Sequence, residues 1–341
     1  MANIVIKVFD NFNDELKAKW DELYNPGAAY NLSFDWCRLW WENFCEYRKL
    51  SIIAIYDKRD DIKLIAPFYK NKNVLSLIGT RPLYFDECNI LYKDKEFIPV
   101  LLDYIFENKL DINLEHVNAR TDFANILTRY LCDKKIRHQA LVSETKQIIN
   151  TEFNPKHGEL KNINRQKRYV ENNLQDSVVF EYDVNKNSKV INEFIELHKS
   201  RWGLFNRKDN TQKYFEDLMR NFENVKLSRL SLKNDDITIA YELGIIDSGG
   251  KYWFLMSAYD RNYNKISPGK VLMYELTKYL LENSVLELDL GRGCEEYKGG
   301  YSNEENVLLF FNSQQFNSIA NVYVQIVNLF DKIVKHLRGT Y

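Results

Sequence analysis

The sequence predicts a mixed α/β fold in which one structural unit occurs twice, each copy built on a mostly antiparallel sheet flanked by helices. Three apolar strands joined by short polar links occur in each half of the chain, at 50–78 and at 226–258. Helices precede each group of strands, and a helix and a further strand follow it, so the order of elements repeats. A chain of 341 residues is also longer than a domain with a single hydrophobic core usually is. We therefore expect two domains, 1–155 and 156–341.

The first half alternates amphipathic helices with apolar strands. Its helix at 33–44 carries Phe34, Trp36, Trp40 and Trp41, and so many large rings favour packing between layers over ligand stacking. Short polar links join its three strands, which indicates an antiparallel meander. The expected elements are strand 4–9, helices 14–24 and 33–44, strands 50–56, 62–69 and 74–78, helix 96–107, strand 112–116, helix 122–134 and strand 139–149.

The second half repeats this order after a boundary near 150–159. Polar links at 234–236 and 247–250 supply the turns of its meander. The expected elements are helix 158–174, strand 178–184, helices 189–202 and 212–222, strands 226–233, 237–246 and 251–258, a helix from 268, strands 285–290 and 307–311, and a last amphipathic helix at 319–337.

The second half also contains a helix start that the first half lacks. Ser267, Pro268, Gly269 and Lys270 follow a polar segment, with Ser267 as N-cap and Pro268 at the first helical position. Unpaired N–H groups and the positive end of the helix dipole suit a phosphate group there. Gly269 would let a ligand approach the backbone, and Lys270 adds a charge. An ordinary capped helix needs no ligand, so both interpretations stay open on these residues alone.

Polar side chains surround the Gly-rich turn that follows the strand at 285–290. The leucines of this strand face one side, whereas Glu287 and Asp289 face the other. Asp289 is either a solvent-facing strand residue, a cap of the turn from Gly291 to Gly293, or a group that orients an acceptor or accepts its proton. Arg292 lies between the two glycines and is expected to be exposed. Its guanidinium could bind an anionic group through two N–H groups at once.

The order of strand, Ser-Pro-Gly helix, strand and Gly-rich turn resembles the acyl-CoA core of the GNAT superfamily of acyltransferases. Ser-Pro-Gly at 267–269, Asp-Leu-Gly-Arg-Gly at 289–293 and Tyr-Lys at 297–298 are, more narrowly, similar to the CelD-like proteins of cellulose operons, relatives of the Fem-type peptidyltransferases. The resemblance is clearest over 159–312. The usual GNAT pyrophosphate loop follows the pattern (Gln or Arg)-x-x-Gly-x-(Gly or Ala). The corresponding residues 264–269 depart from this pattern, because they read Asn-Lys-Ile-Ser-Pro-Gly.

This resemblance implies a tandem GNAT-like fold in which only the second copy binds the acyl donor. The first copy is then degenerate and forms one wall of the acceptor site. It implies that backbone N–H groups near Met256, Ser257 and Ala258 hold a thioester carbonyl, and that residues 267–270 hold the pyrophosphate of acetyl-CoA or another acyl-CoA. The Fem-type relatives carry an aromatic-Lys pair at the position of Tyr297 and Lys298, which makes these two residues catalytic candidates. The expected reaction needs no metal.

The helix at 189–202 ends in His198, Arg201 and Trp202. Cations at a helix C-terminus are favoured by the dipole without any function. Similar family members have His-x-x-Arg-Trp at this place, which implies that His198 is a candidate base and that Arg201 and Trp202 bind substrate.

Two further groups are weaker candidates for acceptor binding. Lys161, Arg165, Lys167 and Arg168 form a basic helix face, which is either solvated or suited to an anionic acceptor such as a nucleotide sugar. Asp86 lies with Tyr84 and Glu87 on a loop after a strand, where binding residues often occur.

Composition excludes several other classes of protein. A net charge of −1 provides no general attraction to nucleic acid, so we expect no DNA partner. Five cysteines without close pairing argue against disulfides and zinc. No apolar run approaches the roughly 20 residues that span a bilayer, and the N-terminus does not resemble a signal peptide. We therefore expect a cytoplasmic protein, with a homodimer possible.

These observations predict transfer of an acyl group, acetyl or longer, from an acyl-CoA to an amine of an amino sugar or another envelope or polysaccharide precursor. Asp289 or His198 would take the proton of the amine, and Tyr297 would protonate the departing thiolate. Fem-type transfer from aminoacyl-tRNA is a second hypothesis, against which stand the near-zero net charge and the absence of a coiled-coil hairpin pattern. A non-catalytic acyl-CoA-binding module is a third.

Overall fold

A computed structural model describes residues 4–25, 27–80, 85–152, 157–206, 210–234, 236–293 and 295–315. Tyr84 and the expected helix at 319–337 lie outside these ranges. The chain forms two compact units. The first comprises residues 1–146, 292–294 and 306–341, and the second comprises 147–291 and 295–305.

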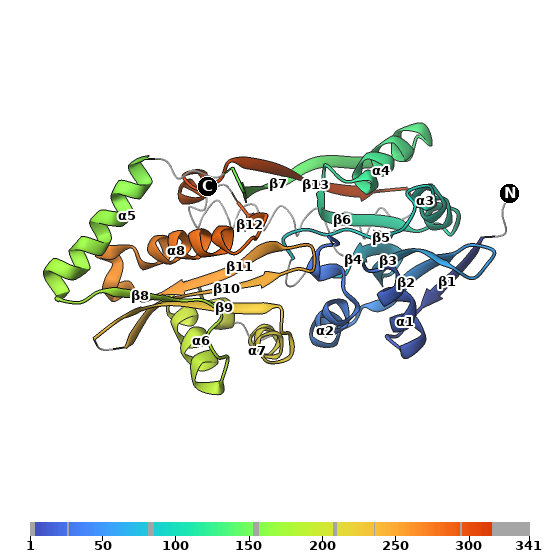
Figure 1. Cartoon of the computed structure of the whole chain (residues 1–341). Coiled ribbons are helices and arrows are strands. Elements are labelled where there is room, and N and C mark those ends of the chain that lie inside the picture. The colour runs from blue at the N-terminus through green and yellow to red at the C-terminus, as the bar shows by residue number, and fades with distance from the viewer. Residues whose placement is uncertain are drawn as a thin grey trace. The chain divides into compact units, whose positions relative to one another are not determined.

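The first unit contains a mixed sheet with helices on both faces (Figure 1). Its strands follow the order β1-β2-β3-β4-β6-β13-β7, with β5 beside β3. The β2-β3-β4 meander is antiparallel, as predicted, and β4 then pairs with β6 in parallel. The elements are β1 (Val5–Phe9), α1 (Asp14–Leu23), the 3-10 turn η1 (Tyr30–Leu32), α2 (Phe34–Phe44), β2 (Lys49–Tyr56), β3 (Ile62–Asn71), β4 (Val74–Leu77), β5 (Leu91–Tyr92), α3 (Phe97–Glu107), β6 (Asp111–Asn118), α4 (Asp122–Asp133), β7 (His138–Asn150) and β13 (Glu304–Ser313), of which β7 from Gln147 onward and the first two residues of β13 belong to the second unit.

The core of the first unit follows directly from its sequence. Strand β2 is an almost unbroken apolar run, and its residues are buried from Leu50 to Tyr56. The aromatic helix α2 packs on this sheet, where the ring of Trp40 stacks on that of Tyr69 with a centroid distance of 5.9 Å. The rings of Trp36 and Trp40 are buried, so they serve as core residues, as the sequence favours.

The second unit repeats this arrangement around the strand order β12-β11-β10-β9-β8. The β9-β10-β11 meander is antiparallel, and β11 then pairs with β12 in parallel. Helix α8 covers one face of the sheet, and α6 and α7 cover the other (Figure 1). The elements are α5 (His157–Tyr169), which continues as a π-helical turn η2 (Val170–Leu174), β8 (Val178–Glu181), α6 (Ser188–Trp202), η3 (Leu204–Asn206), α7 (Thr211–Asn221), β9 (Val225–Leu232), β10 (Ile237–Ile246), β11 (Lys251–Tyr259), η4 (Arg261–Ile266), α8 (Pro268–Glu282), β12 (Glu287–Arg292) and α9 (Glu296–Gly299).

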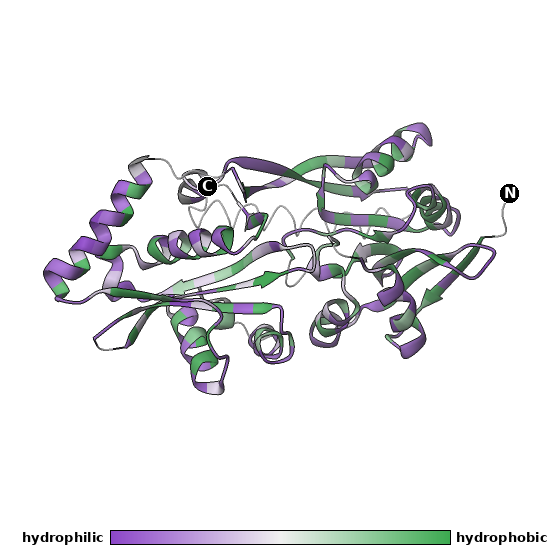
Figure 2. Cartoon of the chain, in the orientation of Figure 1, coloured by the Kyte–Doolittle hydropathy of each residue, from purple (hydrophilic) through white to green (hydrophobic). Residues whose placement is uncertain are grey.

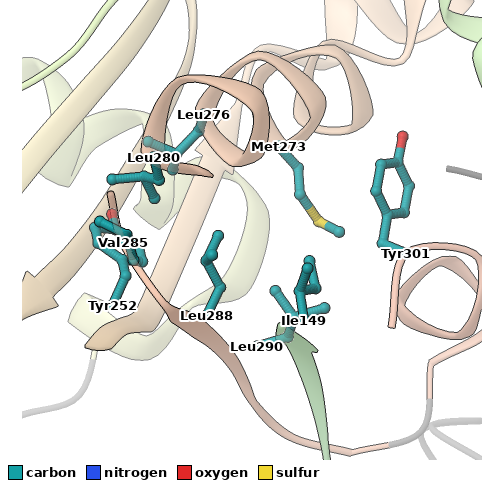
Figure 3. Packing of buried hydrophobic residues seen from close by; sticks show 9 residues of the cluster. All are labelled: Ile149, Tyr252, Met273, Leu276, Leu280, Val285, Leu288, Leu290 and Tyr301. Carbon is teal, nitrogen blue, oxygen red and sulfur yellow. The ribbon is translucent and has the colours of Figure 1, made fainter. Parts of the chain in front are cut away.

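The apolar stripe of α8 forms the core of the second unit. Figure 3 shows Met273, Leu276 and Leu280 of this helix facing the strand residues Leu288 and Leu290. Helix α5 is, in contrast, predominantly hydrophilic along its length (Figure 2). The predicted fold class is confirmed, because mixed sheets flanked by helices occur in both units and the order of elements repeats. Among the described residues, no helix is both long and apolar enough to cross a membrane.

One detail of β12 differs from the sequence pattern. Strict alternation predicts the leucines on the buried face and Asp289 on the polar face, but Asp289 is completely buried and Leu286, which precedes the strand, is 61% exposed. The strand is the parallel neighbour of β11 and is covered on both faces along its centre, so alternation of burial does not apply there.

Candidate active site

Helix α8 begins at the expected place but is not capped in the expected way. Ser267 precedes the helix with a positive φ of 46°, and its side chain makes no capping hydrogen bond. Instead its carbonyl accepts the N–H groups of Lys270 at 2.9 Å and Val271 at 3.2 Å. A Cβ atom at Gly269 would lie 3.2 Å from Cδ1 of Tyr259, so glycine lets the first turn of α8 lie close to the end of β11.

Strands β11 and β12 separate beyond a short paired segment. Their parallel register runs from Lys251↔Glu287 to Trp253↔Asp289 and ends there, whereas β11 continues to Tyr259. The edge of β11 after Trp253 is therefore open on the side that β12 leaves. Residues 254–257 are partly exposed, in agreement with an open edge.

The hydrogen-bond phase of β11 determines which backbone groups reach this edge. Asp260 N donates to O of Ile239, which lies directly opposite it, at 2.9 Å. In an antiparallel pair such bonded positions alternate with unbonded ones. The positions opposite Tyr241 and Leu243, namely Ala258 and Met256, are thus bonded to β10. Of the three residues expected to hold a thioester, Ser257 alone directs its N–H and carbonyl toward the open edge.

The C-terminal end of α6 reaches the same edge. Trp202 Nε1 donates to O of Ser257 at 3.0 Å. The guanidinium carbon of Arg201 lies 4.2 Å from the ring centroid of Trp202 and 3.6 Å from that of Tyr259. The structure thus brings two residues expected to bind substrate to the strand expected to bind the donor.

His198, one turn earlier on α6, lies in an apolar environment. Its ring is buried, contacts the rings of Phe194 and Phe205, and has no hydrogen-bond partner at Nδ1 among the described residues. Burial, followed by the nearby charge of Arg201, lowers the pKa of His198 to about 4. The imidazole is therefore neutral at physiological pH, the form that a base requires, but it is a weak base.

Both carboxylate oxygens of Asp289 make polar contacts. One carboxylate oxygen accepts the N–H of Gly291 at 3.0 Å, and the other lies 3.1 Å from Nζ of Lys251. Lys251 also pairs with Glu287 at 2.6 Å. The turn-capping interaction considered from the sequence is thus present, and the ion pair explains how the carboxylate can be buried.

Lys298 and Tyr297 lie on the short helix α9. The ammonium group of Lys298 lies 2.9 Å from the carboxylate of Glu295, and the lysine side chain is only 6% exposed. The side chain of Tyr297 is outside the described part of the structure. An amine buried to this degree, with an exposed carboxylate partner, is unusual for a surface turn.

Arg292 and Asp86 come together within the first unit, although the sequence suggests separate roles for them. Arg292 Nε lies 3.2 Å from Oδ1 of Asp86, and an Nη group of Arg292 lies 2.9 Å from Nε2 of His116. Arginine can only donate, so Nε2 of His116 accepts, and Nδ1 carries the proton and faces Oγ of Ser143 at 3.3 Å. Nothing in the sequence pattern connects His116 to this group.

The basic face of α5 is exposed in the structure. Arg165 and Arg168 are exposed, and Arg165 donates to Asn162 at 2.7 Å on its own helix. Lys167 pairs instead with Glu275 of α8. The structure does not bring this face to the open edge of β11.

A buried acid beneath α8 was missed by sequence reasoning. Glu242 on β10 is 1% exposed and accepts a hydrogen bond from the phenol O–H of Tyr252 at 2.6 Å, while its other oxygen has no partner among the described residues. Burial raises the pKa of Glu242 to about 8. Its signal is one acidic residue inside the apolar run of β10, where a charge is costly.

Comparison with known proteins agrees with this geometry. Residues 160–299 match the family model described as an acetyltransferase (GNAT) domain. A search of curated protein sequences found no match. The chain resembles FemX with 13% identity and a TM-score of 0.56, covering 91% of this chain and 98% of that one. It also resembles L-PGS of Bacillus licheniformis with 10% identity and a TM-score of 0.57, covering 82% and 88%.

A third solved structure bears on the duplication. A tandem GNAT protein from the clavulanic acid biosynthesis pathway has 9% identity and a TM-score of 0.50, covering 91% of this chain and 98% of that chain. At such identities the likeness shows the fold, and a tandem arrangement agrees with the repeated order of elements. Residues 160–299 thus match a GNAT acetyltransferase domain, and this match supports an acyltransferase.

Proposed function

We propose that the protein transfers an acyl group from acetyl-CoA or another acyl-CoA to an amine of an amino sugar or another envelope or polysaccharide precursor. The observation that carries this proposal is the open edge of β11 beside the N-terminus of α8, within a GNAT domain. An extended thioester donor would lie along this edge, with its pyrophosphate near Ser267 to Lys270.

The chemistry would depend mainly on positioning and on one backbone donor. Ser257 N–H would hold the thioester carbonyl and stabilise the oxyanion that forms on attack. Asp289 or His198 would accept the proton of the amine, and Tyr297 would give a proton to the thiolate. Lys298 would stabilise charge that exists only during reaction.

Other parts of the proposal concern the acceptor and the family branch. The three motifs at 267–269, 289–293 and 297–298 support the CelD-like branch. Arg201 and Trp202, which lie beside the open edge of β11, would bind an anionic sugar or glycan acceptor. Arg165, Arg292 and Asp86 are separate candidates for binding such an acceptor. We further propose a cytoplasmic location and a possible homodimer.

Calorimetry and thiol release on the full chain test the proposal. Acetyl-CoA and a longer acyl-CoA should bind, and an amino-sugar acceptor should release free thiol. Lys298→Ala should lower kcat and kcat/KM by similar factors, on the order of a hundredfold, with donor affinity little changed. Lys278→Ala, an exposed lysine on α8, is the matched control and should remain active.

Three outcomes would contradict parts of this assignment. A fully active Lys298→Ala enzyme would remove Lys298 from the site. Activity with aminoacyl-tRNA and none with any acyl-CoA would replace the proposed donor by that of the Fem-type reaction, and acyl-CoA binding without turnover on any amine would favour a binding module.

A further inference from the structure

His116 lies at an irregular position of β6 in the first unit. The interval 309–311 of β13 lies opposite 114–117 of β6, so β6 carries one extra residue there. His116 falls within this bulge and has a φ of 58°, a left-handed conformation that costs free energy in a residue other than glycine. Because a bulge redirects side chains and backbone groups, the contacts of His116 show what this one provides.

The bulge joins segments of the first unit that are far apart in the chain. The His116 carbonyl accepts the N–H of Cys88 at 3.0 Å, which fixes the loop that carries Asp86. On the ring, Nδ1 faces Oγ of Ser143 at 3.3 Å, and Nε2 accepts an N–H of Arg292 at 2.9 Å. These partners hold a histidine in a costly conformation, and they place the guanidinium beside the loop of Asp86.

Arg292 engages one of the two carboxylate oxygens of Asp86. Oδ1 lies 3.2 Å from Nε of Arg292 and 3.4 Å from its backbone nitrogen. Oδ2 has no hydrogen-bond partner among the described residues, and the side chain of Asp86 is 18% exposed. An ionised carboxylate oxygen can only accept, so Oδ2 can bind a hydroxyl or an ammonium group.

The neighbouring charges favour such a donor over an anion. Arg292 already has Asp86 as its partner, and the buried Lys146 pairs with Glu87 at 2.5 Å. Glu115 on β6, which is 8% exposed, is a third carboxyl group close to the same loop. Three carboxyl groups thus lie beside two cations, and an added anion would be repelled.

We propose that Asp86 binds a hydroxyl or ammonium group of the acceptor through Oδ2, and that His116 is a positioning residue that fixes this carboxylate through Arg292. The inference rests on the proposed function, in which the acceptor is an amino sugar, a molecule that carries both groups. The neutral imidazole suits this role, because it accepts from the guanidinium without adding a charge that would compete with Asp86.

Thiol release from acetyl-CoA tests the contact on the full chain, with glucosamine and glucosamine 6-phosphate as acceptors. Asp86→Asn should raise KM for both sugars about tenfold, because they share the ammonium group and most hydroxyl groups, and should leave KM for acetyl-CoA unchanged. A phosphate bound by Arg292 would give another pattern: Asp86→Asn would lower KM for glucosamine 6-phosphate and leave that for glucosamine unchanged. That pattern would overturn the proposal.

Two substitutions separate the ring of His116 from its backbone. Asparagine tolerates the left-handed conformation but is too short to reach Arg292, so His116→Asn should raise both KM values several-fold. His116→Gln places an amide oxygen near the position of Nε2 and should recover most of the wild-type KM. Combining His116→Asn with Asp86→Asn should add nothing to Asp86→Asn alone. His138→Asn on β7, where the ring contacts the backbone of Ile136, is the matched control and should leave KM unchanged.

Nitrogen-15 NMR reports the contact with Arg292 without any acceptor. The ring nitrogens of His116, identified by their loss in His116→Asn, should show a protonated Nδ1 and an unprotonated Nε2 at neutral pH.

The failures are distinguishable. A proton on Nε2 or an additive double variant would overturn the role of His116, and unchanged sugar KM values in Asp86→Asn would overturn that of Asp86, while the proposed function would stand. Absence of thiol release with both sugars would overturn the proposed amino-sugar acceptor, and the inference with it.

Discussion

At the scale of single residues, burial decides the chemistry of His198 more than its neighbours in sequence do. The ring is 3% exposed, and its pKa falls from an ordinary value of 6.5 to about 4. Between pH 4 and pH 6.5, His198 therefore binds a proton in the unfolded chain but not in the native protein. The contribution of His198 to the free energy of unfolding is complete above pH 6.5 and is lost as pH falls toward 4.

Replacing His198 should remove this part of the pH dependence. Between pH 7 and pH 5, wild-type stability should fall by about 1 to 2 kcal/mol more than that of His198→Phe, measured by urea unfolding at each pH. Phe194→Leu loosens the same cluster but keeps the imidazole, so it should retain the wild-type slope. An identical slope in wild type and His198→Phe would contradict the lowered pKa.

At the scale of elements, Gly244, beside the bulge between β10 and β11, makes room for a buried hydrogen bond. The register shifts between Leu243 and Gly244, and the phenol of Tyr252 passes over Gly244 to reach Glu242. A Cβ atom at position 244 would overlap the phenol oxygen of Tyr252. Glycine is therefore needed there for its small size.

Gly244→Ala should displace Tyr252 and break its bond to Glu242. We expect a loss of about 2 to 4 kcal/mol in the free energy of unfolding, because the core cannot absorb the added methyl group without moving buried side chains. Gly158→Ala on α5 is the matched control, since its Cβ atom would meet nothing within 4 Å. A Gly244→Ala protein as stable as the control would show that Tyr252 moves freely.

Some features of these elements could be predicted from the sequence, and others could not. Periodicity identified the meanders of both halves and the start of α8 at Pro268, because local pattern and turn residues determine these features. It could not identify Ser257 as the residue that faces the open edge, since this depends on the hydrogen-bond phase between two strands. The Asp86–Arg292 pair was also beyond it, because 206 residues separate the partners in the chain.

At the scale of the whole molecule, the compact second unit includes the last residues of β7. It starts at Gln147, and Ile149 belongs to its buried cluster beside Leu290 and Tyr301 (Figure 3). Asn303 N also donates to O of Ile148 at 3.1 Å. The end of β7 is thus part of the core on which α8 packs.

Two fragments should therefore behave differently. A fragment 147–305 should melt cooperatively, whereas 159–305 should lack a cooperative transition, because it has lost a buried isoleucine and the strand that holds residues 302 and 303. Calorimetric melting of both, with far-ultraviolet circular dichroism as a check of helix content, makes the comparison. Cooperative melting of 159–305 would show that the end of β7 is dispensable.

The position of β13 late in the chain has a consequence for how the protein is made. In the first unit β13 lies between β6 and β7, and Ile112 N of β6 donates to Oγ of Ser313, 201 residues further along. At 5 to 20 residues per second, a ribosome needs about 10 to 40 s to synthesise that interval. For that time the nascent first unit displays the unpaired edge of β6, a template for other strands, so newly made chains depend on shielding until residue 313 has emerged.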